Sequence, residues 1–86
     1  MSEQIYVYGL STCPWCRRAK QFFIDHDVPF DFVDIDLLPD DEADRVAAEA
    51  RELSGARSFP VVRIGDQVIS GYNPQRYATI LGIQVR

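Results

Sequence analysis

Apolar and polar side chains alternate along two short segments, residues 4–9 and residues 30–35. β-Branched and aromatic residues with a period of two are typical of strands, so both segments are predicted to be β-strands. Between them, apolar residues recur at helical spacing in a segment that begins near Pro14 and fades at residues 25–27, before Pro29. Proline is well tolerated in the first turn of a helix, which supports a helix start there.

A second helical pattern follows Pro39. Acidic residues 40–42 complement the positive end of a helix dipole. The apolar stripe behind them is narrow and consists of Ala43, Val46, Ala47, Ala50 and Leu53. Gly55 is the predicted C-terminal stop of this helix.

A turn and a third helix complete the chain. The Gly-Asp pair at residues 65–66 separates strand-like runs 61–64 and 67–70, which indicates a β-hairpin. Asn73 is a typical N-cap, and Pro74 fits the first helical position.

The order β-α-β-α-β-β-α predicts an α/β fold with a four-stranded mixed sheet flanked by three helices. The first β-α-β unit should be parallel and right-handed, and the hairpin should add two antiparallel strands. Helices on both faces would bury the sheet. The chain has 86 residues and shows no linker or repeat, so residues 1–86 are expected to form one domain with a small core.

Composition and charge exclude some classes of function. A formal net charge of -4 argues against nucleic acid as a general partner. No apolar run approaches the ~20 residues of a membrane span, and the N-terminus lacks the features of a signal peptide. A cytoplasmic protein without a membrane partner is therefore expected, and a monomer suffices.

Both cysteines lie in the segment Thr-Cys-Pro-Trp-Cys at residues 12–16, between a predicted strand and a predicted helix. In a reducing compartment such a pair is more typical of catalysis or metal binding than of a permanent cross-link. A zinc site needs about four ligands, and the chain offers two Cys and one His. We therefore interpret the pair as a redox dithiol without a metal. A dimeric binding module that shares an iron–sulfur cluster through Cys13 is the alternative from another class.

The two thiols are expected to differ in role. Cys13 is the predicted nucleophile, because the start of a helix favours an anion. Arg17 shares its helical face, and Arg18 and Lys20 lie nearby. The dipole alone is not sufficient, so hydrogen bonds from the Trp15 or Cys16 N–H groups, or from the Cys16 thiol, should also stabilise a thiolate. Cys16, one turn inside the helix, should be more buried and act as the resolving thiol.

Residues 5–23 resemble the strand, CPYC-type active site and first helix of dithiol glutaredoxins, which belong to the thioredoxin superfamily. The Arg-Ser-Phe-Pro segment at 57–60 resembles one that ends in a cis-proline, and Ser-Gly-Tyr-Asn at 70–73 stands where the family has Gly-Gly-x-Asp. The resemblance implies a thioredoxin/glutaredoxin fold, thiol–disulfide oxidoreductase activity and glutathione as co-substrate, with no tightly bound cofactor. The implied substrate or glutathione groove is lined by Trp15, Arg57, Ser58, Phe59, Pro60 in its cis form, Ser70, Gly71, Tyr72 and Asn73.

The electron donor stays open. Leu10 stands where glutaredoxins usually carry Lys or Arg, and Asn73 replaces an Asp that meets the glutathione ammonium group. Arg57 is retained and favours glutathione. Residues 70–75 instead resemble NrdH-type redoxins, which take electrons from thioredoxin reductase and supply ribonucleotide reductase. Glutathione and a thioredoxin-reductase-type flavoenzyme are therefore both candidate donors, with disulfide-containing proteins as targets.

Several other side chains carry expectations. Packing between sheet and helices is expected for Tyr6, Tyr8, Phe22, Phe23, Phe30 and Phe32. Trp15 and Tyr72 should either form an apolar platform for partner proteins or simply cover their neighbours. By the resemblance, the positively charged residues near the cysteines, which would steer acidic partners or anionic thiols, are Arg17, Arg18, Lys20 and Arg57.

Overall fold

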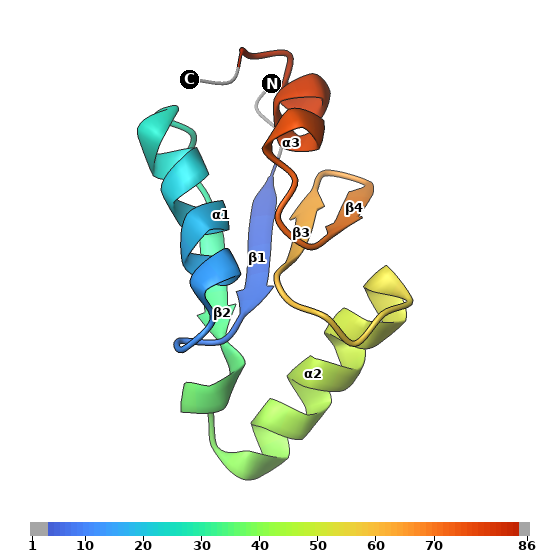
Figure 1. The fold of residues 1–86 in the computed structure, drawn as a ribbon. Coiled ribbons are helices and arrows are strands. Elements are labelled where there is room, and N and C mark those ends of the chain that lie inside the picture. Colours follow the sequence, from blue (N-terminus) through green and yellow to red (C-terminus); the bar gives the residue numbers. More distant parts are fainter. Residues whose placement is uncertain (1–3, 85–86) are drawn as a thin grey trace.

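The computed structural model describes residues 4–84, in which strands and helices follow one another in the predicted order (Figure 1). The strands are β1 (Ile5–Gly9), β2 (Asp31–Asp34), β3 (Val61–Ile64) and β4 (Gln67–Ser70). The helices are α1 (Pro14–Asp25), α2 (Asp40–Ser54) and α3 (Pro74–Leu81), and a short 3-10 turn, η1 (Ile35–Leu37), joins β2 to α2.

The four strands form one mixed sheet in the order β2-β1-β3-β4. β1 runs parallel to β2 and antiparallel to β3, and β4 pairs antiparallel with β3. Tyr8 lies opposite Val33 on one side and Val61 on the other. The parallel β-α-β unit and the closing hairpin are therefore confirmed.

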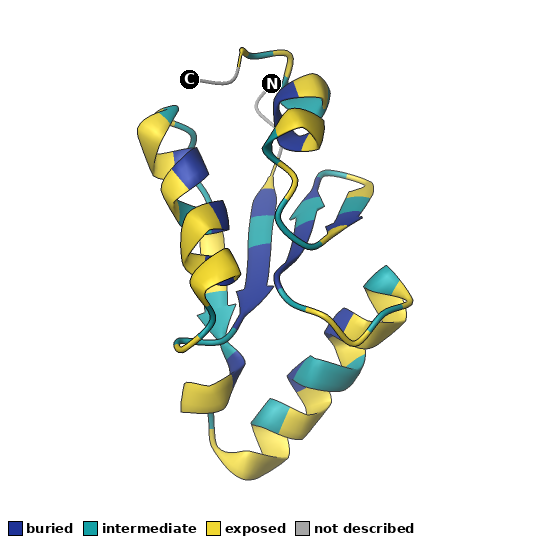
Figure 2. Ribbon diagram, viewed as in Figure 1, coloured by how far each residue is buried: buried dark blue, intermediate teal, exposed yellow. Residues whose placement is uncertain are grey.

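Successive residues of β1 point to opposite faces of the sheet, and each face has its own core. Val7 packs in a cluster with Phe23 of α1 and Tyr77 of α3. Tyr8 packs in a second cluster with Val46 and its neighbours from α2. Helices thus cover both faces, and the buried residues concentrate in the central strands and on the inner sides of the helices (Figure 2).

The residues predicted to cap the helices are found at the helix ends. Gly55 caps α2 with φ +69°, a left-handed conformation that glycine adopts without a steric penalty. Asn73 caps α3 by accepting a hydrogen bond from the Arg76 N–H at 3.1 Å. Within residues 4–84, no helix is both long and apolar enough to cross a membrane.

Two packing predictions are wrong. Leu53 is 37% exposed, because it lies in the last turn of α2 and helical spacing does not reveal how far the neighbouring layer extends. Phe32 is 50% exposed, because β2 is an edge strand and, within residues 4–84, no further strand or helix covers the ring there. Its ring contacts Lys20, whose Nζ lies 4.2 Å from the ring centroid. Ile35, predicted as the end of a strand, begins η1 and is nevertheless buried.

Candidate active site

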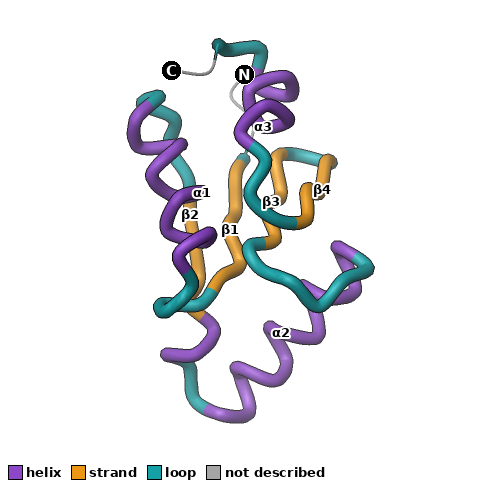
Figure 3. Tube along the Cα trace, viewed as in Figure 1, coloured by secondary structure: helices purple, strands orange, loops and turns teal. Residues whose placement is uncertain are grey.

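Cys13 is the N-cap of α1 and ends the loop that leaves β1. Figure 3 shows this loop between β1 and α1. Its sulfur accepts a hydrogen bond from the backbone N–H of Cys16 at 3.3 Å. The N–H of Cys13 donates to the carbonyl oxygen of Leu10 at 3.1 Å, which closes the turn before the helix. A sulfur in this position meets the donors and the positive dipole end of α1, an environment that favours a thiolate.

Cys16 lies one turn deeper and is fully buried, at 0% exposure, whereas Cys13 is partly exposed. Burial, followed by the side-chain hydrogen bond with Cys13, raises the pKa of Cys16 to about 12. The thiol of Cys16 is therefore neutral at physiological pH while the protein is reduced. The two sulfurs thus differ in their exposure to solvent, and the deeper burial predicted for Cys16 is confirmed.

Gly9, the last residue of β1, lies directly beneath Cys16. A Cβ atom added to Gly9 would lie 3.0 Å from both Cβ and Sγ of Cys16. That separation is shorter than van der Waals contact, so only glycine lets α1 approach the strand this closely. Sequence reasoning treated Gly9 only as the end of a strand, although its place just before the cysteine loop was the available signal.

Gly9→Ala is expected to destabilise the protein by about 1–3 kcal/mol, because the new methyl group overpacks the site of Cys16. Chemical denaturation of the reduced protein measures this cost. A double-mutant cycle with Cys16→Ala is the control, since the contact with Sγ is then absent and the cost should fall. An unchanged cost in the Cys16→Ala background would show that the contact with the sulfur is not its source.

The segment 57–60 approaches the cysteine end of the sheet with a cis peptide bond between Phe59 and Pro60. Pro60 is buried, and its carbonyl oxygen accepts a hydrogen bond from the N–H of Gly71 at 2.7 Å. The hydroxyl groups of Ser58 and Ser70 lie 3.3 Å apart. The structure therefore brings together two segments that the resemblance placed in one groove.

Two aromatic residues from separate segments form a single surface beside Cys13. Trp15 is 52% exposed and stacks on Tyr72, with ring centroids 5.9 Å apart and an interplanar angle of 29°. The guanidinium carbon of Arg18 lies 4.7 Å from the centroid of the Trp15 ring. Trp15 is therefore exposed and stacked on Tyr72, an arrangement compatible with both predicted roles of these rings.

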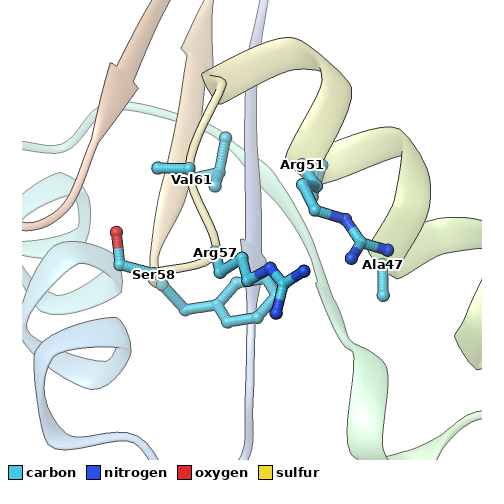
Figure 4. Close-up of a pocket in the computed structure, with 8 residues that line it drawn as sticks. Ala47, Arg51, Arg57, Ser58 and Val61 are labelled. Atoms are coloured by element: carbon cyan, nitrogen blue, oxygen red, sulfur yellow. The ribbon is translucent and has the colours of Figure 1, made fainter.

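Arg57 lines a pocket of about 180 Å³ between α2 and the segment that leads to Pro60. The wall is mostly apolar and includes Ala47 and Val61. Arg51 of α2, which the sequence did not single out, lines it as well. In Figure 4 the guanidinium groups of Arg51 and Arg57 lie on the same side of this segment, and the Ser58 hydroxyl points away from them. The pocket can therefore present two positive charges beside an apolar wall.

Two positive side chains of α1, Lys20 and Arg17, have partners of their own. Nζ of Lys20 lies 3.3 Å from a carboxylate oxygen of Asp34, which offsets its charge. Nη2 of Arg17 donates to the carbonyl oxygen of Ser11 at 3.2 Å. Arg17 therefore contacts the loop that precedes Cys13. The helical spacing did not predict this contact.

His26 lies at the C-cap of α1, away from the cysteines. Its ring nitrogens lie 2.8 Å from the carbonyl oxygen of Phe22 and 3.1 Å from that of Gln84. Among residues 4–84, no three His, Cys, Asp or Glu side chains come together in a way that could hold a metal ion.

Comparisons with known proteins show which family this chain resembles. A family model for glutaredoxin matches residues 5–69. An uncharacterised glutaredoxin-like 8.6 kDa protein from the rubredoxin operon of Clostridium pasteurianum is 36% identical over 69 residues, covering 80% of this chain and 85% of that protein. The glutaredoxin-like protein NrdH of Salmonella typhimurium is 33% identical over 70 residues, covering 81% and 79%.

Solved structures of glutaredoxins and of a glutaredoxin-like protein also match this chain. A glutaredoxin from Archaeoglobus fulgidus matches with a TM-score of 0.84 and 36% identity, covering 90% of this chain and 84% of that one. NrdH-redoxin from Escherichia coli, a glutaredoxin-like protein with a thioredoxin-like activity profile, matches with a TM-score of 0.71 and 28% identity, covering 90% and 93%.

Proposed function

The chain belongs to the glutaredoxin family, and we propose that it reduces protein disulfides and glutathione mixed disulfides with the dithiol of Cys13 and Cys16. The observation that carries this proposal is the asymmetry of the pair. The Cys13 sulfur accepts the Cys16 N–H at the start of a helix, whereas the Cys16 thiol is fully buried and neutral. A reactive first thiol and a protected second thiol are what a two-step disulfide exchange requires.

The proposed reduction of a disulfide has two steps. The Cys13 thiolate attacks one sulfur of the target disulfide, an S–S bond forms between them, and the other target sulfur leaves as a thiolate that takes up a proton. Cys16 then loses its proton and attacks the Cys13 sulfur, which breaks the mixed disulfide and releases the second target sulfur as a thiolate that takes up the proton lost by Cys16. The target gains two electrons and two protons, and the protein is left with a disulfide between Cys13 and Cys16.

Binding of the target is proposed to use the surface around this dithiol. The segment that ends at Pro60 lies beside residues 70–71, so an extended peptide could pair with the backbone of Phe59. The stacked rings of Trp15 and Tyr72 offer apolar contact area next to Cys13. The activity needs no resident cofactor and suits a monomer in the cytoplasm, where cysteines are kept reduced.

Glutathione is the first proposed donor. The two arginines of the pocket beside the Pro60 segment, Arg51 and Arg57, can attract a carboxylate, and the apolar wall can take the rest of a small thiol. Two molecules of glutathione would then reduce the disulfide between Cys13 and Cys16 and leave as glutathione disulfide. Glutathione is therefore a co-substrate in this proposal.

A thioredoxin-reductase-type flavoenzyme is the second candidate donor, with ribonucleotide reductase as the target. It is favoured by the similarity to NrdH proteins and by two side chains. Leu10 offers no charge to a glutathione carboxylate, and the Asn73 oxygen already caps α3. Each of these features weakens glutathione binding without affecting contacts with a large protein partner.

Consumption of NADPH with a protein disulfide separates the two donors. We expect turnover when the protein is coupled to glutathione and glutathione reductase, because Arg51 and Arg57 supply the charge that Leu10 lacks. Turnover only with thioredoxin reductase would replace the first donor by the second. The Cys13→Ser variant is the control for background reduction in both couplings. Absence of turnover in both would contradict the proposed activity itself.

A further inference from the structure

Ser11, in the loop that carries Cys13, is held by two charged side chains from different elements. Its backbone N–H donates to Oδ1 of Asp36 at 2.8 Å, and its hydroxyl donates to Oδ2 of the same carboxylate at 2.5 Å. Its carbonyl oxygen accepts the hydrogen bond from Arg17 at 3.2 Å. All three polar groups of Ser11 are therefore engaged, by η1 on one side and by α1 on the other.

The two bonds to Asp36 fix the orientation of the loop as well as its distance. Both carboxylate oxygens accept, so Ser11 cannot pivot about a single bond, and bonds to an ionised acceptor are stronger than neutral ones. The bonds from Ser11 lower the pKa of the Asp36 carboxyl, as expected when hydrogen bonds stabilise the ionised form. Because 25 residues separate the partners, these two hydrogen bonds, called here the Asp36–Ser11 bracket, join η1, which follows β2, to the loop that leaves β1. Figure 3 shows the course of the backbone in both segments.

The constraint reaches the nucleophile within two residues. The bond from the Cys13 N–H to the Leu10 carbonyl closes a turn that contains Ser11. The side chain of the same Cys13 accepts the hydrogen bond from the Cys16 N–H. Hydrogen bonds weaken steeply when they are misaligned, so a turn fixed at Ser11 preserves the bond that stabilises a thiolate.

We propose that Asp36 is a positioning residue for the thiol chemistry, because it holds Ser11 and thereby keeps the Cys13 sulfur aligned with the N–H groups at the start of α1. This inference rests on the proposed role of Cys13 as the nucleophile. Arg17 supports the same turn from the helix side.

Two effects of Asp36 on Cys13 have opposite signs, which makes the inference testable. Its negative charge disfavours a nearby thiolate, whereas the bracket favours one. Asp36 is fully exposed, so solvent and salt screen the effect of its charge. Removing the side chain should therefore lower the reactivity of Cys13.

The experiment is alkylation of the reduced protein by iodoacetamide, with mass spectrometry to locate the label. Asp36→Ala is expected to lower the rate at Cys13 about 3- to 10-fold at pH 7, within the range that a helix terminus supplies to an anion. At pH 9 to 10 the difference should largely disappear, because a thiol then ionises without such help. Asp36→Asn should retain most of the rate, since its amide can accept from the Ser11 N–H and donate to the hydroxyl. Asp44→Ala removes one exposed charge from α2 and should leave the rate unchanged.

Three results would overturn the inference: an unchanged rate in Asp36→Ala, a faster rate in both Asp36 variants, or an equal loss in Asp36→Asn. If thermal unfolding shows that Asp36→Ala is poorly folded, Ser11→Ala removes only the hydroxyl bond and should show a smaller loss at pH 7, and no loss there would also overturn it. Alkylation needs no disulfide substrate or reductase. A silent NADPH assay together with the expected alkylation pattern would therefore reject the proposed function and keep the role of Asp36.

Discussion

Cys13→Ser is expected to abolish disulfide exchange, with a loss of roughly 1,000-fold or more in the NADPH-coupled reduction of a protein disulfide. A serine hydroxyl is not ionised at neutral pH and cannot form the mixed disulfide with a target. Cys16 cannot substitute, because it is fully buried and its pKa is raised to about 12. No second thiol is then available to attack first.

The same variant should remain folded, which makes the result easy to interpret. Serine is a favourable N-cap, and its oxygen can accept the Cys16 N–H in place of the sulfur. The melting temperature of the reduced variant should therefore stay close to that of the parent protein. Thr12→Ser, at the preceding position, is the matched control and should keep its activity. Substantial turnover by a folded Cys13→Ser protein would show that Cys13 is not the attacking thiol.

Local patterns in the sequence were sufficient to predict the order of the elements. Helix starts at Pro14 and Pro74, the glycine stop at Gly55 and the Gly-Asp turn at 65–66 each act through backbone geometry within a few residues. Such signals do not depend on the rest of the fold. The predictions for Phe32 and Leu53 failed because exposure depends on where the covering layer ends, which periodicity does not contain.

The candidate site divides in the same way. The different exposure of Cys13 and Cys16 followed from their position between a strand and a helix. The bracket from Asp36 to Ser11 and the contact of Gly9 with Cys16 did not follow, because each joins parts of the chain that only the folded sheet brings together. A single sequence has no signal for such contacts unless the residue types themselves are unusual. The implied groove at Pro60 came from the family resemblance and not from the physical pattern.

Cys16→Ser is expected to separate the two proposed reactions. Reduction of a protein disulfide should fall about 100-fold or more, because the mixed disulfide on Cys13 has no internal thiol to resolve it. Deglutathionylation should be largely retained, since Cys13 can remove glutathione from a target and a second glutathione can then reduce the resulting adduct. The coupled NADPH assay with each substrate measures the two rates.

The trapped intermediate gives the sharper evidence. Mass spectrometry of the Cys16→Ser protein after exposure to a protein disulfide should reveal a covalent adduct at Cys13, which disappears on addition of dithiothreitol. The Cys16 side chain is buried against Gly9, so a serine hydroxyl at this position would be buried as well, at a cost in stability. Cys16→Ala buries no polar group and therefore serves as a second variant with the same expected kinetics. Equal inactivity of both Cys16 variants toward a glutathione mixed disulfide would mean that Cys16 takes part before the mixed disulfide forms. The neutral, buried thiol would then have a role in activating Cys13, and the division into a nucleophile and a resolving thiol would be wrong.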